Sequence, residues 1–161
     1  MFLWFAGGAF LAVWLVFRDP AIDHRLVIAG ALLPDLVDAA SGGPWVAHTV
    51  VASVVLLCGT MLATVGRRRL RRQLLALPIG TFLHLVLDGA WTDTETFWWP
   101  ALGTQLGGGR LPSLERGAFN VVLEVAGLII LVWAYRRFRL GEPDRRDHFL
   151  RTGRLGRDLV A

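Results

Sequence analysis

Apolar residues gather in five long runs along the chain, and short polar or arginine-rich stretches separate these runs. The runs cover approximately residues 2–17, 26–40, 45–65, 73–91 and 118–135. The last three have the roughly 20 residues that a helix needs to cross a bilayer. A backbone in hydrocarbon must satisfy its own hydrogen bonds, so we expect helices in every run. The pattern predicts an all-α, polytopic membrane helix bundle with about five transmembrane segments.

The first two runs are short for a complete crossing. Residues 26–40 would form a helix about 22 Å long, against a hydrocarbon core of roughly 30 Å. We expect this run to be partly re-entrant or shielded inside the bundle. The run 2–17 lacks a basic leader and an A-x-A site before Arg18, so a retained helix is expected rather than a cleaved secretory signal.

Composition supports the membrane interpretation. Hydrophobic residues make up 54% of the 161 positions, and charged residues make up only 19%. Soluble domains usually have roughly 45–50% apolar residues, so an ordinary soluble domain is excluded. The one cysteine, Cys58, excludes an internal disulfide and a cysteine-based zinc site.

The arginines predict the orientation of the bundle. All 17 basic residues are arginine. If the N-terminus is outside and every run crosses, all arginines except Arg110 and Arg116 fall on the inner side. The positive-inside rule therefore places the C-terminus in the cytoplasm. Tryptophans prefer the headgroup level, and they fall near both boundaries: Trp4, Trp45, Trp91, Trp98 and Trp99 outside, Trp14 and Trp133 inside.

The chain divides into two parts on this basis. Residues 1–135 form the transmembrane bundle, with an outer loop at 92–117, and residues 136–161 form a basic cytoplasmic tail. The tail is expected to touch anionic lipids. Aromatic residues do not alternate with its arginines as a base-stacking surface requires, which argues against nucleic acid. The expected location is the bacterial cytoplasmic (inner) membrane, and short helices in such a bundle could also form a homo-oligomer.

Ionisable residues inside the apolar runs are the candidate functional residues. An ionisable group at membrane depth is costly, and it usually marks a functional site. No arginine lies inside the runs. Because successive runs cross in opposite directions, all the acidic and imidazole groups inside them fall in the same half of the bilayer. Under the positive-inside rule, this is the outer half. These residues are Asp35, Asp38, His48, His84, Asp88 and Glu124.

Their spacing favours convergence on a metal ion. Asp35 and Asp38 are three residues apart, and His84 and Asp88 are four apart, so each pair shares a helix face. Oxygen and nitrogen ligands without thiolate suit Zn²⁺, Mn²⁺ or Fe. We predict a divalent metal site, with Zn or Mn as the expected ion.

Each of these features has a structural alternative. The His84–Asp88 pair could make a structural hydrogen bond, and the two aspartates of run 26–40 could end that segment at the water interface. His48 could be an interfacial histidine. Glu124 with Asn120 could form a polar clasp between helices. His24 is expected on the inner side, as a loop histidine.

Four motifs resemble the YdjM-like membrane-bound, metal-dependent hydrolases. They are ALLPDLVD at 31–38, AHT at 47–49, FLHLVLD at 82–88 and FWWP at 97–100. The resemblance implies a metal site and a distant relation to zinc-dependent phospholipase C. The ligands that it implies are Asp35, Asp38, His48, His84 and Asp88. The chain departs from the family pattern at Ala47, where a further histidine often stands, and His24 is the only counterpart of an N-terminal-region histidine.

The expected function is a hydrolase at the outer membrane interface. A metal-activated water would attack a phosphoester or similar bond of a lipid or lipid-linked substrate. A carboxylate that does not bind the metal, Asp38 or Glu124, would act as general base. The alternative is a non-enzymatic scaffold, or a membrane protein that handles ions or metals. The inner halves of the runs lack ionisable residues, which favours a one-sided site over an ion path.

Overall fold

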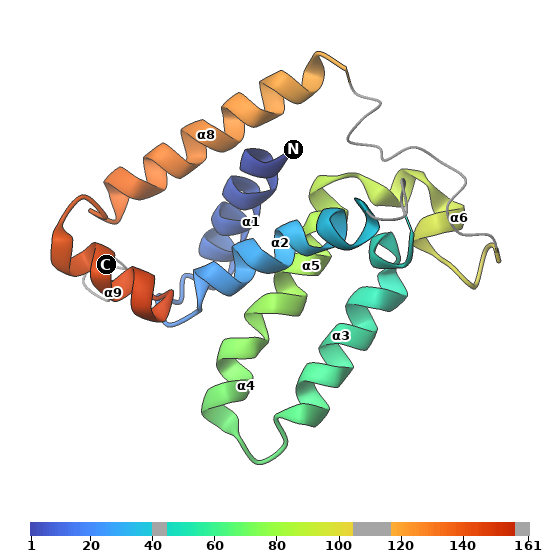
Figure 1. Cartoon of the computed structure of the whole chain (residues 1–161), viewed down its shortest axis with the longest axis horizontal. Helices are drawn as coiled ribbons and strands as arrows, with labels where there is room; N and C mark the ends of the chain where they lie inside the picture. Colours follow the sequence, from blue (N-terminus) through green and yellow to red (C-terminus); the bar gives the residue numbers. More distant parts are fainter. Residues whose placement is uncertain (40–44, 105–116, 157–161) are drawn as a thin grey trace.

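The structure is a computed structural model, and it describes residues 1–39, 45–104 and 117–156 (Figure 1). The described residues form helices and no strand, which confirms the all-α prediction. In chain order the helices are α1 (Phe2–Phe17), α2 (His24–Asp38), η2 (Val46–His48), α3 (Val50–Ala63), α4 (Arg68–Leu74), α5 (Ala76–Leu87), η3 (Ala90–Thr92), α6 (Thr94–Phe97), α8 (Phe119–Arg137) and α9 (Pro143–Thr152). Part of the predicted outer loop, with Arg110 and Arg116, lies outside the described residues.

The turn between α1 and α2 is defined by its caps. Helix α1 ends at Phe17, and the capping residue that follows, Arg18, has a left-handed backbone with a φ of 46°. Helix α2 begins after Asp23, whose side chain accepts hydrogen bonds from the backbone N–H groups of Arg25 and Leu26. Such a cap satisfies donors that the first helical turn leaves unpaired. The chain therefore reverses within a few residues, and the two helices pack side by side.

Helices α2 and α5 touch through glycine. A Cβ atom added to Gly30 would lie 2.1 Å from the carbonyl oxygen of Leu77. A Cβ atom on Gly80 would lie 2.1 Å from the carbonyl oxygen of Val27. Only glycine permits this backbone approach. The contact fixes the spacing of the two helices that carry Asp35 and His84.

Helix α8 packs on α1 through a second glycine contact. Gly7 and Gly127 face each other, and a Cβ atom on Gly127 would lie 2.3 Å from the backbone of Leu3. Further along, Phe10 packs with Ala134 and Phe138, so the two helices run in the same direction. The carboxylate of Glu124 accepts a hydrogen bond from the backbone N–H of Leu3 at 2.8 Å. Glu124 thus caps the first turn of α1.

The first part of the predicted tail folds back on the bundle. The carbonyl of Gly153 accepts a hydrogen bond from the N–H of His24 at 2.9 Å, and Leu155 donates to Pro20 at 3.0 Å. Arg25 donates to the carbonyl of Leu150 at 2.5 Å. Helix α9 and the residues after it therefore cover the α1–α2 turn, while residues 157–161 lie outside the described residues.

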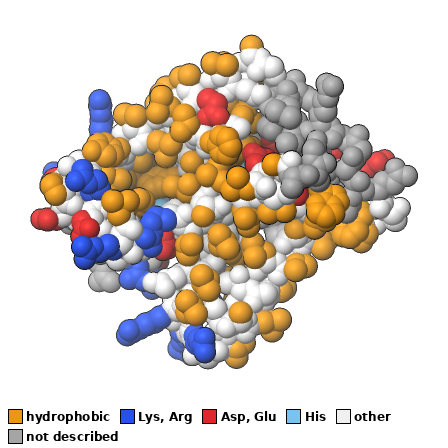
Figure 2. All heavy atoms as spheres, in the orientation of Figure 1, with side chains coloured by type: hydrophobic (Ala, Val, Ile, Leu, Met, Phe, Trp, Pro, Cys, Tyr) orange, Lys and Arg blue, Asp and Glu red, His pale blue; other side chains and the backbone are white. Residues whose placement is uncertain are grey.

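Helix α8, with 19 residues, is the one helix in the described ranges that is long and apolar enough to cross a membrane. Helices α1 and α3 are apolar but shorter. Run 73–91 is divided among the end of α4, the whole of α5 and the start of η3. Figure 2 shows arginines gathered near α9 and around α4, with hydrophobic side chains over much of the remaining visible surface. Five complete crossings remain a prediction.

Candidate metal site

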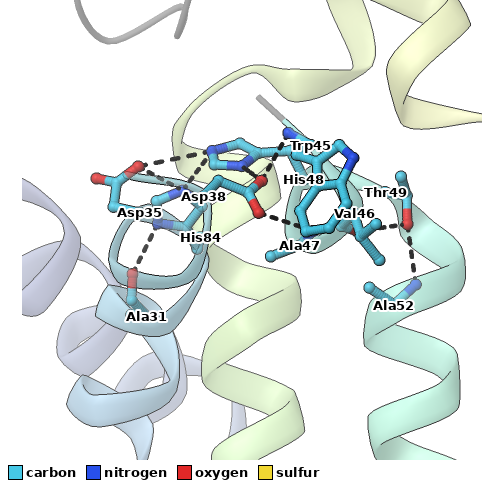
Figure 3. Close-up of polar contacts among 10 residues, drawn as sticks. All are labelled: Ala31, Asp35, Asp38, Trp45, Val46, Ala47, His48, Thr49, Ala52 and His84. Carbon is cyan, nitrogen blue, oxygen red and sulfur yellow. Dashed lines mark hydrogen bonds and ion pairs between the residues drawn. The ribbon is translucent and has the colours of Figure 1, made fainter. Parts of the chain in front are cut away.

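Three side chains from separate elements converge at one end of the bundle (Figure 3). Asp35 lies late in α2, His48 ends η2 and His84 lies in α5. The Nε2 atoms of the two histidines are 3.4 Å apart. The Oδ1 atom of Asp35 lies 3.6 Å from Nε2 of His48 and 3.5 Å from Nε2 of His84. The three atoms form a nearly equilateral triangle.

The backbone of α2 orients His84. Its Nδ1 atom lies 2.7 Å from the carbonyl oxygen of Ala31. A carbonyl oxygen only accepts, so Nδ1 carries the proton and Nε2 presents a lone pair to the triangle. The imidazole is fully buried, and it packs against the ring of Phe5 with centroids 4.1 Å apart. His84 is therefore held in one orientation.

Asp38 orients His48 in the same way. Its Oδ2 atom lies 2.6 Å from Nδ1 of His48. The carboxylate also accepts hydrogen bonds from the backbone N–H groups of Trp45, at 2.7 Å, and Ala47, at 3.2 Å. Nδ1 of His48 is thus the donor, and its Nε2 faces the triangle. Carboxylates behind histidines in this manner are common around protein metal ions.

The triangle consists of acceptors alone. With both Nδ1 atoms protonated, two imidazole lone pairs and a carboxylate oxygen face one another within 3.6 Å. The Oδ1 atom of Asp35 is buried and has no hydrogen-bond partner among the described residues. Such groups repel unless positive charge lies between them. The arrangement therefore requires a cation or an additional proton.

The dimensions of the triangle fit a zinc ion. Zinc bonds to nitrogen and oxygen are about 2.0–2.2 Å long, and tetrahedral geometry then places the ligand atoms roughly 3.3–3.6 Å apart. The distances between the three atoms are 3.4, 3.5 and 3.6 Å. Catalytic zinc sites typically have three protein ligands and leave the fourth position to water or substrate. The donor set and its spacing suit a site of that kind.

Two predicted ligands lie beside the triangle instead of in it. Asp38 accepts a hydrogen bond from Nδ1 of His48, so its role in the structure is to orient this histidine. Asp88 follows the end of α5 and is fully buried. Its backbone N–H donates to the carbonyl of His84 at 2.8 Å, but its carboxylate is not part of the group whose ligand atoms lie within 4.8 Å of one another. The ligand set that the structure brings together is smaller than the set expected from the motifs.

Glu124 and His24 lie elsewhere. Glu124 bonds to the first turn of α1, so the geometry does not support its expected role as general base. His24 is buried at the start of α2, with its ring 4.8 Å from that of Phe10. The role of the Ala31 carbonyl in orienting His84 could not be predicted from the sequence. Every residue has a backbone carbonyl, so the residue type does not show which one accepts a hydrogen bond.

Comparisons with known protein families, curated proteins and solved structures find no match for this chain. The resemblance of its motifs to the YdjM-like hydrolases is therefore an expectation that no similar protein tests.

Proposed function

We propose that the protein is a membrane-embedded, metal-dependent hydrolase. Its substrate is a lipid or lipid-linked molecule at the outer membrane interface, and the bond that it breaks is a phosphoester or a similarly polarised bond. One observation carries the proposal. Asp35, His48 and His84 aim three ligand atoms at one point, and both imidazoles are oriented from behind by fixed acceptors.

The membrane part of the proposal is supported by apolar surface that the bundle leaves uncovered. In α8, only 11% of the apolar window is buried. Helix α3 exposes Val55 and Leu62, with 63% and 73% of their surface accessible. A helix that is apolar on all sides belongs inside a large core or a bilayer. In this proposal all five runs cross, with the N-terminus outside and the C-terminus in the cytoplasm.

The triangle supplies the binding chemistry. Two neutral imidazoles and one carboxylate would hold Zn²⁺, the best fit to the spacing, with Mn²⁺ as the alternative. Such an ion lowers the pKa of a coordinated water and polarises a phosphoryl oxygen, as phosphoester hydrolysis requires. Asp38 and the Ala31 carbonyl keep the imidazoles in the required tautomer, and burial of both rings excludes competing water.

Hydrolysis also requires a group that moves a proton. The attacking water forms a bond to phosphorus and loses a proton, while the ester oxygen leaves and gains one. Both oxygens of Asp38 accept hydrogen bonds. Asp88 is a second fully buried carboxylate, and it directly follows α5, the helix that carries His84. We therefore assign proton transfer to Asp88 in this proposal.

A protein that handles protons or ions is the second candidate. The same three acceptors are held together if a second proton on His48 is shared with Asp35, without any metal. This alternative predicts the same side-chain positions. It differs in metal content, so elemental composition separates the two candidates.

Elemental analysis is the first test. Protein purified in mild detergent should contain about one equivalent of zinc. His84→Ala should lose that metal, whereas His148→Ala, which removes an exposed histidine of α9, should retain it. Wild-type protein that stays metal-free after incubation with zinc would reject the proposal in favour of the proton-sharing alternative.

Turnover is the second test. Zinc-loaded protein should hydrolyse phosphoesters, and Asp35→Asn should lose that activity together with the metal. Protein that binds zinc through these residues but hydrolyses neither soluble nor lipid phosphoesters would reject the hydrolase and leave a metal-binding membrane protein.

A further inference from the structure

Helices α1, α3 and α5 enclose an apolar groove of about 360 Å³. Its walls include Val13 and Val16 from α1, Val54 and Leu57 from α3, and Phe82 from α5. Nearly all of the lining is carbon. A groove of this composition favours a hydrocarbon chain over a polar ligand.

One end of the groove lies next to the candidate metal site along the chain. The lining residue Val50 follows His48 by two positions, and the lining residue Leu83 directly precedes His84. At the other end Val16 is 74% exposed and Phe17 is 51% exposed. The groove therefore runs from the level of the site to an apolar surface that would face the bilayer.

The lining contains one polar side chain that needs a partner. Ser53 of α3 is only 4% exposed, and its buried Oγ atom has no hydrogen-bond partner among the described residues. Serine in a helix often bonds to the carbonyl four residues earlier, but Ser53 does not. A buried hydroxyl without a partner is costly. A ligand with a hydrogen-bond acceptor at this depth would satisfy it.

The position of Ser53 defines where that acceptor must lie. Ser53 is four residues after Thr49, which is about 6 Å along the helix axis at 1.5 Å per residue. Thr49 directly follows His48. In an ester-linked phospholipid, the carbonyl of the acyl ester lies a few bonds from the phosphate. A phosphate at the triangle and an ester carbonyl at Ser53 are thus compatible with one molecule.

We infer that the groove binds one acyl chain of an ester-linked phospholipid substrate, and that Ser53 donates a hydrogen bond to the ester carbonyl oxygen. This inference rests on the proposed function, because it assigns the phosphate of the same lipid to the triangle. A polyprenyl phosphate would fill the groove with hydrocarbon but would leave Ser53 without an acceptor.

Photocrosslinking tests occupancy of the groove without relying on turnover. The probe is a phosphatidic acid analogue with a diazirine in its acyl chain, added to zinc-loaded protein in detergent. We expect crosslinks on the lining segments of α1, α3 and α5. Leu57→Trp should reduce them by roughly ten-fold or more, because a chain that loses two buried methylenes loses about that much affinity. Val55→Trp, at a residue of α3 that is exposed and does not line the groove, is the control.

Ester and ether analogues of the same chain length test the role of Ser53. The ether lipid lacks the carbonyl oxygen, so it should bind the wild type less tightly than the ester lipid. In Ser53→Ala the ratio of the two affinities should fall about three- to ten-fold, the worth of one hydrogen bond. An unchanged ratio, or a polyprenyl phosphate that binds the wild type as tightly as the ester lipid, would overturn the assignment.

The outcomes separate this inference from the proposed function. Zinc-dependent hydrolysis of a soluble phosphoester, without crosslinks in the groove, would support the proposed hydrolase activity. The same result would overturn the inference that the groove binds an acyl chain. Crosslinks in the groove that Leu57→Trp abolishes, without hydrolysis of any phosphoester, would support the lipid site and reject the hydrolase.

Discussion

The tautomer of each histidine is decided by an acceptor outside the triangle. The Ala31 carbonyl and the Asp38 carboxylate each receive an Nδ1–H, so both Nε2 lone pairs point to the same place. Neutral imidazoles that are fixed in this way bind a metal without a cost of reorientation. The two acceptors differ in one respect, since only Asp38 is a side chain that substitution can change.

Asp38→Asn should therefore weaken the site without removing a ligand of the triangle. The amide keeps the size of the carboxylate, but its NH₂ group must face a donor, because Trp45, Ala47 and His48 all donate to this side chain. Loss of such an orienting carboxylate typically reduces metal affinity about 10–100-fold. Competition with a chromophoric chelator measures the effect.

The matched control for this substitution is Glu95→Gln, which changes an exposed carboxylate at the start of α6. It should leave the affinity for zinc at the wild-type value. If Asp38→Asn binds zinc as tightly as Glu95→Gln does, the role assigned to Asp38 is wrong.

His24 lies outside the five apolar runs, and its burial predicts that the stability of the protein depends on pH. Burial lowers the pKa of His24 below its ordinary value of 6.5, although the carbonyl of Ile22 opposes the shift. The unfolded chain takes up a proton near pH 6.5, and the folded protein takes it up only at lower pH. Stability should therefore fall as the pH drops below 6.5, until His24 also protonates in the folded state.

His24→Gln tests this linkage through melting temperatures in detergent at pH 7.5 and pH 5.5. The variant should be less stable at pH 7.5, because it loses the contact with Phe10, but its stability should depend less on pH. The slopes of the free energy of unfolding against pH should differ between the wild type and His24→Gln by at most about 1.4 kcal/mol per pH unit. His148→Gln, at an exposed position, should keep the wild-type pH dependence. Equal slopes for the wild type and His24→Gln would contradict the assignment.

Glycine contacts set the distances between whole helices. The α2–α5 contact at Gly30 and Gly80 lies directly behind the triangle, because Ala31 and His84 belong to the same pair of helices. The α1–α8 contact at Gly7 and Gly127 lies on the other side of α1. Both contacts are backbone against backbone, so neither can accept a methyl group without a shift of the helices.

Alanine substitutions at these glycines should separate stability from metal binding. Gly80→Ala and Gly127→Ala should each destabilise the protein by roughly 1–3 kcal/mol, the usual cost of overpacking. Only Gly80→Ala should also weaken zinc binding, since it moves α2 away from α5 and widens the triangle. Melting temperatures and chelator competition provide the two measurements.

Gly59→Ala is the control, because its Cβ would meet nothing within 4 Å. There alanine should be neutral or stabilising by about 0.5–1 kcal/mol, as in an exposed helix. Equal losses of zinc affinity in Gly80→Ala and Gly127→Ala would show that the site responds to general loosening instead of the α2–α5 distance.

For the molecule as a whole, the sequence was sufficient to predict the all-helical fold and to predict that the chemically active side chains lie at one end of the bundle. Apolar runs predict helices, and their alternating directions predict that Asp35, His48 and His84 share one end. The rotation of each helix about its axis was not predictable, because it depends on tertiary contacts such as those at Gly80 and Gly127. For that reason Glu124 lies early in α8, as expected, but its carboxylate bonds to the start of α1 instead of the triangle.

Sidedness in the membrane leads to the last prediction. The triangle lies at one end of the bundle, and the helix ends that carry most of the arginines lie at the other. If the bundle spans a membrane, the positive-inside rule would place the triangle outside. Cys58 can be replaced by alanine, so that single cysteines report on each side. Leu102, which is 62% exposed beyond α6, should be outside, whereas His148 of α9 should be inside.

A membrane-impermeant maleimide measures this topology in intact cells. It should label Leu102→Cys directly and His148→Cys only after the membrane is permeabilised. The reverse pattern would place the triangle at the cytoplasmic face, and the lipid substrate would then have to come from the inner leaflet. Labelling of both positions in intact cells would contradict the crossing by α8, because α8 is the one predicted crossing between these two residues.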